Sequence, residues 1–455
     1  MFPSSARRIR FMVPGLVMAC LALLPGLAHA QSISIATLND LDKIGRDPAY
    51  PLDGAYVLTA DIDALVTQVW NGGAGFEPIG TESTPFTGTF DGQGHVIQNL
   101  YINRPDADYV GLFGYTGSGA QIQNIGLEGG SVTGRDAVGS LVGVNNGSLT
   151  SCYATGAVTA RNTDSERIAA AGGLVGYNYY GTLTSCYATG AVSATSYGGA
   201  HAGGLVGKNF VYHAHLTSCY ATGSVSASGN PAYAGGLVGG NYEATLTSCY
   251  ATGGVMATAW SNYSKAYAGG LVGDNYGVLT SCYATGAASA TTTGYYRTVT
   301  YAAGGLVGGN RGILTSCYAT GLVTATTTGS FGNAYAGGLV GRNYGTLTSC
   351  YWDVETTGQS RGVGDGTAGG TGLTTAQMKQ QASFAGWDFT TVWTIRETRT
   401  YPYFPWQNRV VPGVTGQDEA VARATIISAG LAVGAVTRQC SDTVPAGSVI
   451  SQDPA

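Results

Sequence analysis

The segment AGGLVGYNYYGTLTSCYATGAV, residues 171–192, recurs with small changes through the middle of the chain. Each copy carries one cysteine, and successive cysteines are 34, 33, 30, 33, 35 and 33 residues apart. A fixed period in this range indicates a repeat architecture, in which each unit packs on its neighbours.

Each copy contains three short runs that favour strands. GGLVG is apolar with glycines, an Asn with Tyr and Gly follows as a turn, and LTSCYAT is rich in β-branched and aromatic residues. A glycine then precedes a third run such as AVSA, residues 191–194. We therefore expect an all-β fold, a right-handed parallel β-helix (β-solenoid) with three strands per coil and short capping helices. The alternative is a seven-bladed propeller, but its blades need about 40–45 residues and four strands.

Two side-chain columns are expected along this solenoid, because equivalent residues stack about 4.8 Å apart in parallel coils. Cys and Tyr are sequence neighbours, so we expect Cys and its flanking Ala to point inward and Tyr outward. Leu and Cys are three residues apart in LTSC, so in a regular strand they would face opposite sides. A bulge could therefore invert the expected directions of Cys and Tyr. The columns are Cys152, Cys186, Cys219, Cys249, Cys282, Cys317 and Cys350, and Tyr153, Tyr187, Tyr220, Tyr250, Tyr283, Tyr318 and Tyr351.

GGLVG followed by N-x-G-x-L-T-S-C-Y-A-T-G resembles the GLUG-motif repeat family of bacterial surface proteins. That family occurs in filamentous-haemagglutinin-like adhesins and in non-catalytic parts of large IgA-specific metalloproteases. The resemblance covers seven copies, from Val138 to about Asp353, and it implies a surface protein with a binding or adhesion role.

The first 30 residues have the features of a signal peptide. Arg7, Arg8 and Arg10 precede an apolar run over residues 11–24, and Ala28-His29-Ala30 forms a cleavage site. Cleavage after Ala30 predicts an exported protein that is secreted, on the cell surface or in the periplasm. Acidic residues outnumber basic ones, 26 to 21, and the leader holds three of the arginines. This balance argues against nucleic acid as a partner.

The repeats span residues 110–352, and we expect the regions on either side of them to form caps. Residues 31–109 should form an N-terminal cap and the first coils, with a short helix over 35–46 capped by Thr37. Residues 353–409 should form a C-terminal cap that seals the last coil. A helix is expected over 375–383, with Thr374 and Gln377 as a capping box.

Residues 410–455 resemble a PASTA domain with a helix over 417–429. The resemblance implies a small α+β module that binds cell-wall muropeptides or acts as a spacer. The sequence stops at Ala455, before the family's last strand, so we expect a partial PASTA domain.

The segments that vary between repeats are expected to emerge on one edge of the solenoid, where solenoids usually bind. They are rich in Tyr, Ser, Thr and Asn, which suits contact with a glycan or protein and equally suits simple solubility. The candidate ligand-binding residues are Arg167, Tyr197, Tyr233, Trp260, Tyr263, Lys265, Tyr295, Tyr296 and Arg297.

No catalytic, cofactor or metal site is predicted. The chain lacks HExxH, and its repeats contain few acids. Asp61 with Asp63, and His213 with His215, are better explained as structural residues than as metal ligands.

Three functions follow from these patterns. The first is a non-catalytic exported solenoid that binds a glycan or protein ligand on a cell surface or matrix. The second is a peptidoglycan-binding protein in which residues 410–455 bind and the solenoid is a spacer. The third is a β-helix carbohydrate-active enzyme, which would need carboxylates gathered on one face of the solenoid.

Overall fold

The protein is nearly all β, and its parallel sheets form a β-solenoid, as the repeats predict. The computed structural model describes residues 32–260, 265–292, 300–327, 333–407, 412–428, 433 and 436–452. The predicted signal peptide lies outside the described residues. Every strand-to-strand ladder is parallel and in register, which excludes the antiparallel blades of a propeller.

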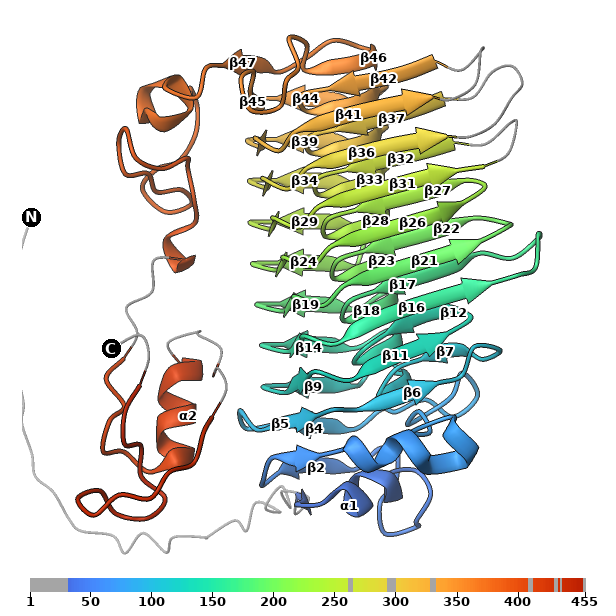
Figure 1. The fold of residues 1–455 in the computed structure, drawn as a ribbon, viewed down its shortest axis with the longest axis vertical. Helices are drawn as coiled ribbons and strands as arrows, with labels where there is room; N and C mark the ends of the chain where they lie inside the picture. Colours follow the sequence, from blue (N-terminus) through green and yellow to red (C-terminus); the bar gives the residue numbers. More distant parts are fainter. Residues whose placement is uncertain are drawn as a thin grey trace, which may run out of the picture. The chain divides into compact units, whose positions relative to one another are not determined.

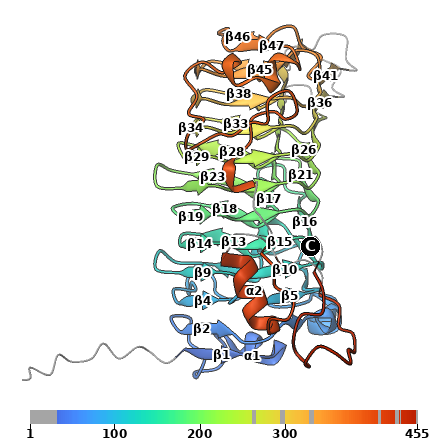
Figure 2. The same cartoon turned by 90° about the vertical axis from the view of Figure 1, so that its left-hand side faces the viewer.

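From β4 to β43 each coil has five strands rather than the predicted three, so five sheets run along the solenoid (Figure 1). Sheet I has 11 strands, which are stacked one above the next in Figure 2. They are β1 (Ile33–Ile35), β2 (Ala55–Leu58), β4 (Thr89–Asp91), β9 (Gln121–Gln123), β14 (Ser148–Thr150), β19 (Thr182–Thr184), β24 (His215–Thr217), β29 (Thr245–Thr247), β34 (Val278–Thr280), β39 (Ile313–Thr315) and β44 (Thr346–Thr348).

Sheet II carries the Tyr of each repeat. Its strands are β3 (Ile62–Asp63), β5 (Val96–Gln98), β10 (Gly126–Glu128), β15 (Tyr153–Ala154), β20 (Tyr187–Ala188), β25 (Tyr220–Ala221), β30 (Tyr250–Ala251), β35 (Tyr283–Ala284), β40 (Tyr318–Ala319), β45 (Tyr351–Asp353) and β47 (Thr371–Leu373).

Sheet III follows in each coil. Its strands are β6 (Tyr101–Asn103), β11 (Ser131–Gly134), β16 (Ala157–Asn162), β21 (Val192–Ser196), β26 (Val225–Gly229), β31 (Val255–Ala259), β36 (Ala288–Thr292) and β41 (Val323–Thr327).

Sheets IV and V are built from the GGLVG part of each repeat. Sheet IV comprises β7 (Asp108–Val110), β12 (Asp136–Gly139), β17 (Ala169–Gly172), β22 (Ala200–Gly203), β27 (Ala232–Gly235), β32 (Lys265–Gly269), β37 (Thr300–Gly304) and β42 (Asn333–Gly337). Sheet V comprises β8 (Phe113–Tyr115), β13 (Val142–Asn145), β18 (Val175–Asn178), β23 (Val206–Phe210), β28 (Val238–Tyr242), β33 (Val272–Asn275), β38 (Val307–Asn310), β43 (Val340–Asn343) and β46 (Val363–Gly366).

The two additional strands per coil result from two turns that the sequence does not predict. The Ser of each LTSC adopts a left-handed backbone, with φ between 48° and 54°, and separates sheet I from sheet II. Because of this turn, Leu183 and Cys186 point to the same side although they are three residues apart, and both are fully buried. The second corner is the Gly-Leu step of GGLVG, which separates sheet IV from sheet V.

The asparagine after GLVG is not merely a turn residue, because it belongs to a buried ladder. Each Asn donates from Nδ2 to Oδ1 of the Asn in the next coil, at 2.8–3.0 Å. Thr116 donates to the first Asn, and the last donates to the Thr367 carbonyl. The members are Asn145, Asn178, Asn209, Asn241, Asn275, Asn310 and Asn343.

The seven repeat cysteines are buried in the solenoid interior and none is in a disulfide. Each thiol lies near a backbone carbonyl; in Cys249 the Sγ is 3.5 Å from the Leu216 oxygen. Burial raises the pKa of the Cys152, Cys219 and Cys282 thiols, which keeps them protonated.

We expect Cys249→Ala to lower the free energy of unfolding by only about 1 kcal/mol, the cost of a small void. Loss of a native disulfide would cost about 2–5 kcal/mol. Thiol counting on denatured, unreduced protein checks the same point, and fewer than two free thiols would contradict it.

The repeat tyrosines point away from the interior and stack on one another. Ring centroids are 4.7–5.0 Å apart from Tyr153 to Tyr318, with ring planes within 6° of parallel. Offset stacking at this spacing is favourable for aromatic rings.

The predicted C-terminal cap does not simply seal the last coil. Residues 363–373 add β46 and β47 to it, whereas residues 374–407 turn back along sheet II (Figure 1) and cover the tyrosine column from Tyr220 to Tyr351. Trp406 packs against Tyr250, and Trp393 and Trp387 pack against Tyr318. The cause is the column itself, because an exposed row of rings is a large apolar surface to cover.

The predicted helices are present in shortened form. Helix α1 (Leu38–Lys43) is capped by Thr37, which accepts from the Asp40 amide. Thr374 and Gln377 form the reciprocal capping box, but the 3₁₀ turns η2 (Gln377–Lys379) and η3 (Gln381–Ser383) replace the α-helix. The others are η1 (Leu65–Gly73), η4 (Pro405–Gln407) and α2 (Glu419–Ser428).

Candidate functional site

The loop residues predicted to bind a ligand lie in several separate places, as far as the structure describes them. Tyr197 and Trp260 contact each other edge to face, with centroids 6.0 Å apart. Arg167 lies near Asp164 and Asp108, at 3.6 and 3.7 Å, and Lys265 is exposed at the start of β32. Tyr263, Tyr295, Tyr296 and Arg297 lie outside the described residues.

Tyr233 lies apart from the other loop residues, because it belongs to β27 of sheet IV. Its ring stacks on His201 of the preceding coil, with centroids 4.6 Å apart. The two residues are register partners on neighbouring strands. Tyr233 is therefore part of the regular solenoid wall. Its neighbours belong to a different candidate site, outside the variable loops.

An outer row of aromatic and cationic side chains follows the end of sheet V. Tyr179, Phe210, Tyr242 and Tyr276 stack in succession with centroids 4.8, 5.4 and 5.5 Å apart. Arg311 takes the next place, with its guanidinium 4.9 Å from the Tyr276 ring centroid and 5.8 Å from that of Tyr344. Tyr276 and Tyr344 are 41% and 52% exposed. We call these six residues the outer row.

The outer row covers a buried seam between sheets IV and V. Sheet V contributes the variable residue x of the GGLVGxN motif to this seam, for example Lys208, Asp274 and Arg342. Sheet IV contributes residues such as His201 and Tyr267. Glycines at some of these places make room for neighbouring rings. A Cβ on Gly309 would lie 2.8 Å from the Tyr267 ring.

Sequence reasoning missed both features because it treated GGLVG and the following Asn-Tyr as structural. The available signal was a variable position inside an otherwise constant motif. Tyr, Lys, Gly, Asp, Gly and Arg follow GLVG in six successive copies.

The seam holds several ionisable groups whose burial shifts their pKa values. Burial raises the pKa of Asp136, whose carboxylate accepts from the Tyr177 hydroxyl at 2.9 Å. Burial lowers the pKa of His201 well below its usual value and brings the pKa of Lys208 to about 8. The Lys208 ammonium is surrounded by three rings, at 4.6–5.5 Å from their centroids.

Asp274 is the most perturbed carboxyl of the seam. Its side chain is only 4% exposed, and burial raises its pKa to about 7. Arg311, with Nη1 3.5 Å from the Asp274 carboxylate, opposes the shift. A carboxyl with a raised pKa favours the folded state when protonated, so its contribution falls between about pH 4 and pH 7 and is lost above pH 7.

We expect Asp274→Asn to raise the free energy of unfolding at pH 8, by about 1–3 kcal/mol, and to leave it nearly unchanged at pH 4. Chemical denaturation at pH 4, 6 and 8 measures this difference. A uniform loss of stability at all three pH values would show that Arg311 fully compensates the buried charge.

The candidate metal pairs have other roles in the structure. Asp61 accepts from the Val96 amide and lies 3.1 Å from Nδ1 of His95, and Asp63 accepts from the Asn99 amide group. His215 is exposed on β24. Among the described residues, no group of three or more His, Cys, Asp or Glu is placed to hold a metal ion.

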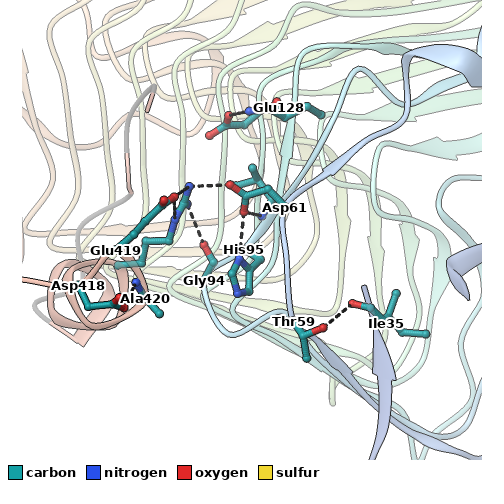
Figure 3. A network of polar contacts seen from close by, with 12 residues as sticks. Ile35, Thr59, Asp61, Gly94, His95, Glu128, Asp418, Glu419 and Ala420 are labelled. Carbon is teal, nitrogen blue, oxygen red and sulfur yellow. Dashed lines mark hydrogen bonds and ion pairs between the residues drawn. The ribbon is translucent and has the colours of Figure 1, made fainter. Parts of the chain in front are cut away.

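Asp61 also belongs to a polar network with helix α2 (Figure 3). Arg423 of α2 is 4% exposed; it donates to Asp61 at 2.6 Å and to Glu419 at 3.1 Å. The Gly94 carbonyl lies 3.5 Å from the same guanidinium. A buried arginine with two carboxylate partners is well compensated, so the helix has a specific contact with the first coils.

Comparison with known families matches two parts of the chain. Residues 169–193, 198–226 and 230–256 match the family described as the GLUG motif, and residues 409–455 match the PASTA domain. None of the described helices is long and apolar enough to cross a membrane.

Two curated proteins share part of this sequence. Halomucin of Haloquadratum walsbyi is 44% identical over 110 residues, which are 23% of this chain and 1% of halomucin. A protein of Evansella cellulosilytica named as a Gly-rich membrane protein is 40% identical over 78 residues, 17% of this chain and 9% of that protein. The chain therefore spans only a small part of these relatives.

Two solved structures are similar at low identity. A Bacteroides ovatus protein described as an immunoglobulin A1 protease has a TM-score of 0.43 and 19% identity, over 82% of this chain and 92% of that one. A second, described as IgA1 protease, has a TM-score of 0.41 and 16% identity, over 78% and 24%. The chain is a β-solenoid protein with GLUG motifs and a C-terminal PASTA domain.

Proposed function

We propose that this protein is exported and acts, without catalysis, by binding a glycan or protein ligand at a cell surface or in the surrounding matrix. The GLUG motifs and the halomucin and membrane-protein relatives support a surface location. The outer row is the observation that carries the binding role. Tyrosine and arginine are enriched where proteins bind partners, because one side chain supplies apolar area and hydrogen bonds together.

Rigidity supports the outer row as the binding surface. Each of its side chains follows an Asn of the buried ladder, so the row is fixed to regular strands instead of long loops. Arg311 is held from both sides, since it donates to the Tyr276 hydroxyl at 2.7 Å and lies over the Tyr344 ring. A prepositioned row loses little conformational entropy when a ligand binds.

A glycan and matrix-protein array with the chain from residue 32 onward tests the proposal. We expect at least one class of ligand to bind, and Tyr276→Ala combined with Tyr344→Ala to weaken that binding by tenfold or more. The matched control is Tyr212→Ala, which removes another tyrosine that is 70% exposed. Equal losses in both variants, with unchanged melting temperatures, would contradict the role of the outer row.

A second candidate function is peptidoglycan binding, which the PASTA match favours. In that case the C-terminal module binds and the solenoid is a spacer. Purified peptidoglycan should then retain the full chain and not a chain ending at residue 409. The outer-row variant should be retained as well as the wild type.

The absence of catalysis is also part of the proposal. The acids of the seam each have a partner: Asp136 binds Tyr177, Asp274 lies near Arg311, and Asp365 pairs with Arg342 at 2.9 Å. Incubation with bacterial and plant polysaccharides should release no reducing ends or unsaturated sugars. If such products are released, and a single Asp or Glu substitution abolishes their release, the protein is a carbohydrate-active enzyme instead.

A further inference from the structure

Arg311 is the single charged residue of the outer row. Its guanidinium lies 4.9 Å from the ring centroid of Tyr276 in the preceding coil and 5.8 Å from that of Tyr344 in the next coil. The backbone amide of each of these three residues donates to an asparagine carbonyl of the preceding coil, at 2.7–2.8 Å. The two rings and the backbone together hold the guanidinium in one place.

Within the described residues, a single nitrogen of Arg311 has hydrogen-bond partners. Nη1 donates to the Tyr276 hydroxyl at 2.7 Å and lies 3.5 Å from Oδ1 of Asp274. No described residue accepts a hydrogen bond from Nε or Nη2, and the side chain is 32% exposed. These two nitrogens form one edge of the guanidinium, which binds a carboxylate or a sulfate through two parallel hydrogen bonds.

The charges near Arg311 favour an anionic ligand at this end of the outer row. Its inner partner Asp274 is only 4% exposed, and burial raises the pKa of this carboxyl to about 7. Arg342, in the next coil, pairs with Asp365 at 2.9 Å, so this pair adds no net charge. Glu243 is exposed after Tyr242, two coils before Arg311, which makes the other end of the row less favourable for an anion.

The spacing of the outer row favours a glycan chain over a peptide. Parallel coils place Tyr276, Arg311 and Tyr344 about 4.8 Å apart along the solenoid axis, which is close to the length of one sugar unit in an extended chain. Side chains on one face of an extended peptide repeat every 6.6 Å or so, about twice the rise per residue, and would fall out of register with the row. The two tyrosines are 41% and 52% exposed, so each offers a ring edge and a hydroxyl to a sugar.

We propose that Arg311 binds the anionic group of an acidic glycan, a carboxylate or a sulfate ester, while Tyr276 and Tyr344 contact the adjoining sugar rings. The glycan runs along the solenoid axis, and its anion accepts from Nε and Nη2 of Arg311. This inference rests on the proposed function, because it names the class of ligand that the outer row binds.

The unsubstituted chain from residue 32 onward gives the first test, which does not depend on any variant folding. Its affinity is measured for polygalacturonate oligosaccharides and their methyl esters, and for dextran sulfate and dextran. We expect an acidic glycan to bind at least about tenfold more tightly than its neutral counterpart, because only the anion completes the bidentate contact. The acidic glycan that shows this difference identifies the anion as a carboxylate or a sulfate.

Two variants that differ only at Arg311 give the second test. Asp274→Asn is compared with Asp274→Asn combined with Arg311→Gln, so that neither protein holds an unpaired buried carboxylate at residue 274. The single variant should bind the acidic glycan at least as well as the unsubstituted chain, and the double variant at least about tenfold more weakly. Arg161→Gln removes an exposed arginine of sheet III and is the charge-matched control, which should bind normally.

Equal binding of the acidic and neutral glycans, equal binding by the single and double variants, or an equal loss with Arg161→Gln would overturn the inference. Polyglutamate that binds through Arg311 as tightly as polygalacturonate would overturn the assignment to a glycan. If a neutral ligand binds through Tyr276 and Tyr344, the inference fails and the proposed function stands. If no ligand binds the outer row, both fail.

Discussion

Gly235→Ala is expected to lower the free energy of unfolding by about 3 kcal/mol or more, and to disorder the surrounding coils. Gly235 ends β27 of sheet IV where this sheet approaches sheet V. A Cβ there would lie 2.0 Å from the Val238 carbonyl oxygen and 2.6 Å from the Gly273 nitrogen. Both atoms belong to the backbone, so no side-chain rotation can relieve the clash.

Gly254→Ala is the matched control, because a Cβ on Gly254 meets nothing within 4 Å. Its effect should stay within about 0.5 kcal/mol, as for most surface substitutions. Urea denaturation followed by circular dichroism compares the two. Similar midpoints for both variants would show that sheets IV and V do not approach as closely as described.

Asn241→Ala is expected to cost about 3 kcal/mol, because it interrupts the asparagine ladder near its middle. Asn241 donates to the Asn275 side chain at 2.9 Å and to the Ala244 carbonyl at 3.0 Å, and it accepts from Asn209 at 3.0 Å. Removing it leaves the Asn209 amide group without its acceptor in a fully buried place.

Gln123→Ala provides the comparison, since it removes one half-buried hydrogen bond, to Asp91 at 2.9 Å. That loss should stay near or below about 1 kcal/mol. Calorimetry of both variants decides between the two costs. An Asn241→Ala protein as stable as Gln123→Ala would mean that the ladder contributes little beyond ordinary hydrogen bonds.

The parallel stack was predictable because the cysteine spacing is nearly constant and the strand residues are β-branched. The number of strands per coil was not, because Ser185 and its equivalents adopt a left-handed backbone that favours Gly or Asn. That turn divides LTSCYAT into two strands and places Leu183 and Cys186 on the same side.

The course of residues 374–407 depends on tertiary contacts that local sequence does not encode. The capping box at Thr374 and Gln377 was readable from spacing, and it is present. From the sequence, the aromatic residues that follow are predicted to seal the last coil. They instead pack on the tyrosine column, which is visible as a continuous surface only when the coils are stacked.

The candidate site was only partly predictable for a related reason. Tyr197 and Trp260 were identified because they lie in segments that vary between repeats, and they contact each other. Tyr276 and Tyr344 follow the Asn that recurs in each repeat, and from the sequence this segment is predicted only to form a turn. Their alignment into the outer row arises from the register of sheet V across several coils.

Pulsed electron–electron distance measurements test the in-register parallel stack most directly. Spin labels would replace Arg161 and, in turn, Thr258, Thr291 and Thr326, which occupy one column of sheet III. Coils about 4.8 Å apart predict a steady increase, to a backbone separation of about 24 Å for the pair five coils apart. A separation that rises and then falls, as around a closed ring of blades, would contradict the solenoid.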